Sequence, residues 1–128
     1  MKKIFHKNKL FAIQVKSMRP GSKPITLGKG ALQLLTFKHS RGRVVEAHFH
    51  EPKQRMTKQL QECLIVSKGR IKVTLYDDGK KMFKNLYLRA GEAIIFLSGG
   101  HKVEVKEDAE MYEIKNGPFI DDKIFINS

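Results

Sequence analysis

The chain has little or nothing of several features that mark common classes of protein. Its 128 residues contain one cysteine, Cys63, and no tryptophan. A single cysteine excludes an internal disulfide framework and any cysteine-rich zinc site, and it suits a reducing cytoplasm. The longest uninterrupted apolar run, residues 93–97, is far too short to span a membrane. Because polar residues 6–9 interrupt the start of the chain, we expect no cleaved signal peptide and a cytoplasmic location.

Acidic residues are absent from the first third of the chain. Residues 1–45 contain eleven Lys and Arg and no Asp or Glu, whereas residues 46–128 contain fourteen Lys and Arg and thirteen Asp and Glu. Nearly all of the net charge of +12 therefore lies in this basic N-terminal third. It can attract an anionic partner, or it can simply form a solvated lysine-rich surface. We expect no nucleic-acid partner, since the region has no recognisable nucleic-acid-binding motif.

The spacing of apolar residues predicts one all-β domain over residues 1–128. Apolar residues recur with period two or in short runs, and turn signals follow at intervals of about ten residues. The predicted strands are residues 10–15, 31–37, 43–50, 61–67, 70–76, 82–88, 93–97, 102–105 and 109–115. Many short strands with regular turns are typical of a sandwich or barrel. Residues 51–60 are irregular and suit a long loop or a short helical turn.

Two histidines stand side by side in the predicted strand 43–50. Residues two apart on a strand project from the same face, so His48 and His50 share a face with Glu46. Two imidazoles so placed can bind one metal ion or act together on a substrate. They can also be two histidines on a solvent-facing strand.

Two further strands each place a polar group on an apolar face. Glu62 shares a face with Leu64 and Val66, and a carboxylate there needs a partner such as a cation or a metal. His101 shares a face with Val103 and the valine two residues further on, so it points inward, as a ligand or as a core histidine. Neutral imidazoles with one carboxylate suit Fe(II), Mn(II), Ni(II) or Zn(II), with coordination positions left open for substrate.

These residues resemble the motifs of the cupin family. The first cupin motif has a glycine, five residues and His-x-His, then a spacer, a glutamate, six residues and a second glycine. The chain matches both halves, with Gly42, His48 and His50, and then Glu62 and Gly69. Its spacer is longer than the family's usual one. The second motif is matched by Gly91 and His101, with Leu97 in place of a proline.

The resemblance implies a cupin-type double-stranded β-helix, that is, a jelly-roll barrel, with its motifs between about residues 31 and 115. It implies one divalent metal ion, of undetermined identity, held at the mouth of the barrel by His48, His50, Glu62 and His101. It also implies a homodimer, as in many cupins. Residues 99–101, 113–118 and 122–123 look like a subgroup of small bacterial cupins associated with surface-polysaccharide genes.

Several other residues are candidates for roles near this site. Glu46 can serve as a catalytic acid or base, or as a salt-bridge partner. The basic residues Lys53, Arg55 and Lys58 can grip a phosphate or carboxylate, or they can belong to a solvated loop. Tyr112 can line the barrel or take part in packing.

The expected function is binding or conversion of a small oxygen-rich or anionic molecule, such as a sugar derivative. A metal-dependent isomerase, epimerase or dioxygenase is one hypothesis. The alternatives are a non-enzymatic ligand-binding module and a metal-free sugar-nucleotide isomerase in which His48 or His50 is the base.

Overall fold

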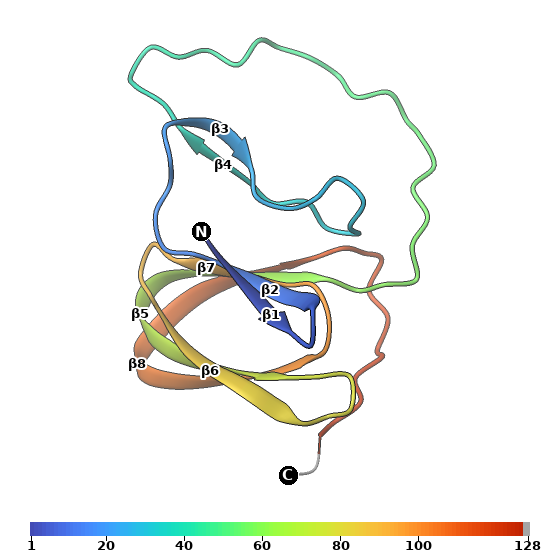
Figure 1. The fold of residues 1–128 in the computed structure, drawn as a ribbon. Coiled ribbons are helices and arrows are strands. Elements are labelled where there is room, and N and C mark those ends of the chain that lie inside the picture. The colour runs from blue at the N-terminus through green and yellow to red at the C-terminus, as the bar shows by residue number, and fades with distance from the viewer. Residues whose placement is uncertain (127–128) are drawn as a thin grey trace.

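The computed structural model describes residues 1–126, which form eight β-strands and no helix (Figure 1). The fold is therefore all-β, as the sequence predicts. The strands are β1 (Lys2–His6), β2 (Lys9–Val15), β3 (Gly21–Pro24), β4 (Leu35–Lys38), β5 (Glu62–Tyr76), β6 (Met82–Arg89), β7 (Ala93–Phe96) and β8 (Gly100–Lys115).

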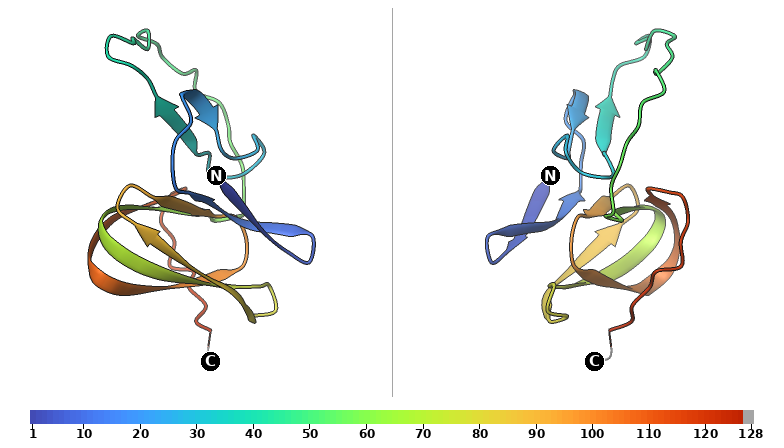
Figure 2. Two further views of the ribbon diagram at one scale, coloured as in Figure 1. Left: turned by 60° about the vertical axis from the view of Figure 1, so that its left-hand side comes forward. Right: turned by 90° about the vertical axis from the view of Figure 1, so that its right-hand side faces the viewer.

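Six strands form one antiparallel sheet that curls into a half-barrel (Figures 1 and 2). The strand order is β1-β2-β7-β5-β6, and β8 also pairs with β5. The two longest strands, β5 and β8, run side by side through the bend. The first part of β5 pairs with β7 on its other edge, and the last part pairs with β6. One long strand pair thus links the two walls of the half-barrel.

Gly69 allows the bend in β5. Its φ is +81°, and a Cβ atom there would lie 2.1 Å from the backbone oxygen of Asp108 in β8. The register between β5 and β8 shifts between Val66 and Ile71. The sequence predicted a turn here between two strands, and likewise between 102–105 and 109–115. Both breaks instead lie within continuous strands. Gly69 marks an irregularity of the β5–β8 pairing rather than a turn, and β8 continues opposite it through residues 106–108.

The apolar core lies inside the curl, with a second cluster on the outside. Inward-facing residues of the sheet, including Val66, Ile71 and Val73, are fully buried. On the outer face, Ile13, Cys63 and Ile95 pack against partly buried residues of the β3–β4 arm and its turn, among them Ile25, Leu32 and Leu34. The arm is therefore attached to the outer face of the sheet by apolar contacts.

Residues 39–61 form a long connection without a strand between β4 and β5. The prediction of a strand at residues 43–50 is wrong for this structure, because the segment has no neighbouring strand to pair with and its residues are exposed. The sequence also missed β1 and β3. In β1 only Ile4 is buried, so the alternation of buried and exposed residues is too short to be recognised in the sequence. No helix long and apolar enough to cross a membrane occurs among residues 1–126.

Candidate functional site

The candidate site lies at the end of the half-barrel where β5 begins with Glu62. The strand register places Glu62 opposite Phe96 of β7 and Lys115 of β8. Alternation then points its side chain to the same face as the buried Leu64 and Val66. Only 17% of the Glu62 side chain is exposed. The carboxyl group of Glu62 is buried because Leu64 and Val66, which follow on the same face of β5, belong to the apolar core.

His101 reaches the same place from β8. It lies opposite Leu75, a core residue, and its ring stacks on Phe96 with centroids 3.9 Å apart and planes 6° from parallel. Its Nε2 atom lies 3.4 Å from Oε2 of Glu62. The structure thus brings together two residues that the sequence placed on separate strands.

A third titratable residue, Glu113, completes this cluster, and it is not among the residues predicted from the sequence. Glu113 lies opposite Leu64 on β8, one step along the inner face from Glu62. The carboxyl groups of Glu62 and Glu113 share a hydrogen bond, which requires one of them to carry a proton. Alternation in 109–115 places Glu113 on the face of Met111, so an inward carboxylate could have been recognised in the sequence.

The proton of the carboxyl pair belongs to Glu62. Burial raises the pKa of Glu62 to about 7, with help from the hydrogen bond to Glu113 and its charge, although Lys115 and Lys123 act against the shift. The hydrogen bond from Glu62 lowers the pKa of Glu113, and the nearby cations act in the same direction. At pH 7 about half of the Glu62 carboxyl groups therefore carry a proton, while Glu113 is a carboxylate.

The imidazole of His101 is neutral under the same conditions. Burial lowers its pKa, and Lys123 adds to this effect, whereas the carboxylate of Glu113 opposes it. The cluster of Glu62, His101 and Glu113, here called the proton cluster, thus combines a carboxyl group with a pKa of about 7, a neutral imidazole and a carboxylate. Such groups can donate and accept protons near neutral pH.

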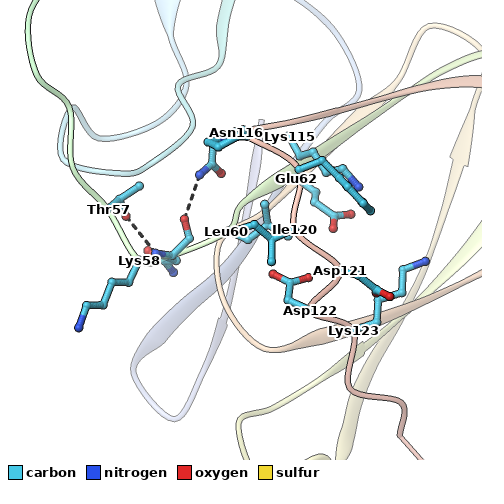
Figure 3. A pocket seen from close by; sticks show the side chains of 14 residues that line it. Thr57, Lys58, Leu60, Glu62, Lys115, Asn116, Ile120, Asp121, Asp122 and Lys123 are labelled. Atoms are coloured by element: carbon cyan, nitrogen blue, oxygen red, sulfur yellow. Dashed lines mark hydrogen bonds between the residues drawn. The ribbon is translucent and has the colours of Figure 1, made fainter.

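Two cavities meet at Glu62. One, of about 570 Å³, lies between residues 57–62 and residues 115–123, and Figure 3 shows Glu62 among its lining side chains. The other, of about 350 Å³, is lined by both Glu62 and His101. The larger cavity combines apolar side chains with charged ones, as ligand sites commonly do. Its charged lining residues are Lys58, Glu62, Lys115, Asp121, Asp122 and Lys123.

Asn116 holds the rim of the larger cavity in place. Its Oδ1 atom accepts a hydrogen bond from the backbone amide of Gln61 at 2.9 Å, and its Nδ2 group donates to the backbone oxygen of Gln59 at 3.1 Å. The side chain of Gln59 in turn donates to the backbone oxygen of Leu97. The chain entering β5 is thereby fixed to the chain leaving β8.

The other two predicted metal ligands lie elsewhere. His48 and His50 are in the exposed 39–61 connection, with ring centroids 5.0 Å apart. Glu46 lies in the same connection, and its backbone oxygen accepts a hydrogen bond from Nδ1 of His48 at 2.7 Å. Within residues 1–126, no three His, Cys, Asp or Glu side chains lie close enough together to hold a metal ion. The four predicted ligands are not gathered in this structure.

The remaining predicted residues divide between the cavity and the surface. Lys58 lines the larger cavity. Lys53 and Arg55 are exposed in the 39–61 connection, where Arg55 donates to the backbone oxygen of Lys53. Tyr112 is opposite Ile65 on the outer face and is 65% exposed, so it does not face Glu62. Cys63 is buried on that outer face, and burial raises its pKa to about 11, as befits a core residue.

The chain matches no protein-family model, no curated protein and no solved structure.

Proposed function

We propose that the chain binds a small, oxygen-rich molecule, such as an anionic sugar derivative, beside Glu62 and transfers protons on it. The observation that carries the proposal is the position of the Glu62 carboxyl group, 3.4 Å from His101 and at the meeting point of two cavities, where burial raises its pKa. A structural ion pair needs no cavity, whereas an acid–base group must be reached by its substrate.

The larger cavity is lined by three lysines and also by Asp121 and Asp122, which suits a hydroxyl-rich ligand that carries an anionic group. Lys58, Lys115 and Lys123 line the larger cavity and can pair with a phosphate or carboxylate. Glu62 can then donate a proton while His101, which lines the second cavity, accepts one. Isomerisation or epimerisation of a sugar derivative needs this combination and consumes no oxidant, because the proton removed from a carbon is returned at a neighbouring atom or on the opposite face of the same carbon.

The cupin jelly roll is part of the same proposal. The strongly curled sheet supports it, since a half-barrel with two walls joined by β5 and β8 is a large part of such a fold. A sugar-binding role would also suit the resemblance to cupins associated with surface polysaccharides.

A metal site is a second candidate, because Glu62 and His101 are two of the four predicted ligands and lie side by side. As they are placed here, the four residues do not fit one metal ion, since His48 and His50 are remote in the 39–61 connection. Fe(II), Mn(II), Ni(II) or Zn(II) binding would require that connection to move and Glu62 to lose its proton.

Deuterium exchange tests proton transfer without advance knowledge of the product. The protein is incubated in D2O with hexose phosphates and nucleotide-linked hexoses, and carbon-bound deuterium is measured by NMR and mass spectrometry. We expect incorporation with at least one compound, and loss of it in Glu62→Gln. The matched control is Glu110→Gln, which changes an exposed glutamate of the neighbouring strand β8.

Each other outcome has a defined meaning. Binding without deuterium incorporation would leave a non-enzymatic ligand-binding module. No binding of any compound would refute the proposal. Metal content, measured beside a His48→Ala/His50→Ala variant, decides the second candidate: one equivalent that is lost in the variant supports a metal site.

A further inference from the structure

Residues 117–126, here called the strap, run along the side of the half-barrel, and few interactions hold them there. After β8 ends at Lys115, the chain turns back beside the half-barrel without forming a strand (Figures 1 and 2). Within residues 1–126, no backbone group of the strap takes part in a backbone hydrogen bond. A segment without such bonds moves at little cost in free energy.

The strap is attached at its two ends. At the first end, the side chain of Asn116 forms hydrogen bonds with the backbone of Gln59 and Gln61. At the other end, Ile126 packs on Gly100 at the start of β8, so closely that a Cβ atom on this glycine would lie 2.9 Å from Cδ1 of Ile126. The chain between these two attachments can therefore move without breaking a backbone hydrogen bond.

The strap leaves most of its apolar surface in water. Four of its large apolar residues are between 68% and 79% exposed: Phe119, Ile120, Ile124 and Phe125. Phe119 and Ile120 also line the larger cavity together with Leu60, which is itself 40% exposed. Because burial of apolar side chains is favourable, these residues favour a strap that folds inward over the cavity.

Unpaired lysines oppose this closure when no ligand is bound. Lys58, Lys115 and Lys123 line the larger cavity, and within the part of the chain that the structure describes none of them is in an ion pair. Asp121 and Asp122 of the strap supply at most two partners for these three lysines. Removing the remaining ammonium group from water without a partner is unfavourable, so an anion is needed to complete the closed state.

The anion belongs beside Lys123. Burial and the hydrogen bond between Glu62 and Glu113 account for most of the pKa shifts in the proton cluster, and the charge of Lys123 also acts on each of its three members. The ammonium group of Lys123 is therefore within electrostatic reach of the whole cluster. Figure 3 shows Lys123 on the strap among the residues that line the cavity with Glu62.

We propose that the strap is a lid that closes over the larger cavity when an anionic ligand binds, and that Lys123 contacts the anion. The ligand supplies the partner that the lysines lack, and closure then buries Phe119 and Ile120 against Leu60. It also removes water from the proton cluster, which strengthens electrostatic interactions there. The inference rests on the proposed function in that it takes the ligand to be an anion bound beside Glu62, but closure requires no proton transfer.

Because the chain has no tryptophan, a single fluorescent reporter can be placed on the strap. Phe125→Trp suits this purpose, since Phe125 is 78% exposed and is not among the residues that line the cavity. We expect inorganic phosphate to shift the emission of this variant to shorter wavelength and to reduce its quenching by acrylamide. Phe5→Trp, at a position of β1 that is 58% exposed, is the control and should show neither change. Circular dichroism checks that both variants fold.

Phosphorus NMR measures phosphate binding independently, through broadening of the phosphate signal. In the reporter background, Lys123→Gln should raise the phosphate concentration needed for broadening and for the emission shift about 10-fold. Lys102→Gln changes an exposed lysine of β8 outside the cavity lining and should leave that concentration unchanged.

The outcomes separate the lid from the proposed chemistry. Phosphate binding without an emission shift, or no phosphate binding, would overturn the lid, and deuterium incorporation that depends on Glu62 would still support proton transfer. An emission shift that depends on Lys123, without deuterium incorporation from any compound, would refute the proton transfer and support the lid.

Discussion

The protonated state of Glu62 leads to a prediction about how stability depends on pH. In the unfolded chain Glu62 has its ordinary pKa of 4.5, whereas in the folded chain burial and Glu113 raise it to about 7. Between these values the folded state holds a proton that the unfolded state has lost. Stability from this group is therefore complete below pH 4.5 and falls as the pH rises toward 7.

The size of the effect follows from the shift. One pKa unit corresponds to about 1.4 kcal/mol, so a shift from 4.5 to about 7 corresponds to roughly 3 kcal/mol. The lowered pKa of Glu113 has the opposite sign, and its contribution is lost only at more acidic pH. Over pH 5 to 8, the loss of stability should therefore be about 2–3 kcal/mol.

Glu62→Gln removes this titration but keeps a hydrogen-bond donor for Glu113. We expect the variant to match the wild type at pH 5 and to exceed its unfolding free energy by about 2 kcal/mol at pH 8. Urea unfolding at several pH values measures the difference, and comparison with the wild type cancels the titration of the histidines. Parallel curves from pH 5 to 8 would refute a proton held by Glu62, and Glu110→Gln should give such parallel curves.

Three further predictions test the fold and the cavity rim. Gly69→Ala should lower the unfolding free energy by more than about 1 kcal/mol, since φ of Gly69 is +81° and the backbone of Asp108 occupies the place of a Cβ atom. Gly28→Ala is the control: no atom lies within 4 Å of a Cβ added at Gly28, so this variant should be nearly neutral in urea unfolding. Ile71→Ala, at a fully buried position, should cost about 2–5 kcal/mol in the same assay. Asn116→Ala should lower the unfolding free energy by about 1–3 kcal/mol and speed hydrogen exchange at residues 59–61, because it removes the two hydrogen bonds of Asn116 at the cavity rim. Unchanged exchange at these residues would show that Asn116 does not hold the rim.

Much of the sheet follows from local pattern. The predicted strands 10–15, 82–88 and 93–97 correspond closely to β2, β6 and β7, because each alternates or runs apolar between clear turn residues. The breaks within β5 and β8 could not be predicted in the same way. Whether Gly69 ends a strand or bends it depends on how closely the backbone of β8 approaches, which is a tertiary contact.

The candidate site likewise has features that local sequence pattern predicts and features that depend on tertiary contacts. Alternation alone indicated that Glu62 and His101 point inward, since a charged residue on an apolar face can be recognised locally. Their closeness and the participation of Glu113 depend on the register of three strands that are distant in sequence. The spacing of His48 and His50 suggested a strand, but a strand needs a neighbour, and the described structure provides none within the same chain.

The sequence by itself determined the all-β class, the uneven distribution of charge and the inward direction of Glu62 and His101, because each depends on composition or on the two-residue period of a strand. Only the tertiary structure decided the curl of the sheet and the raised pKa of Glu62. A pKa depends on burial and on neighbouring charges, and both arise when β5, β7 and β8 come together.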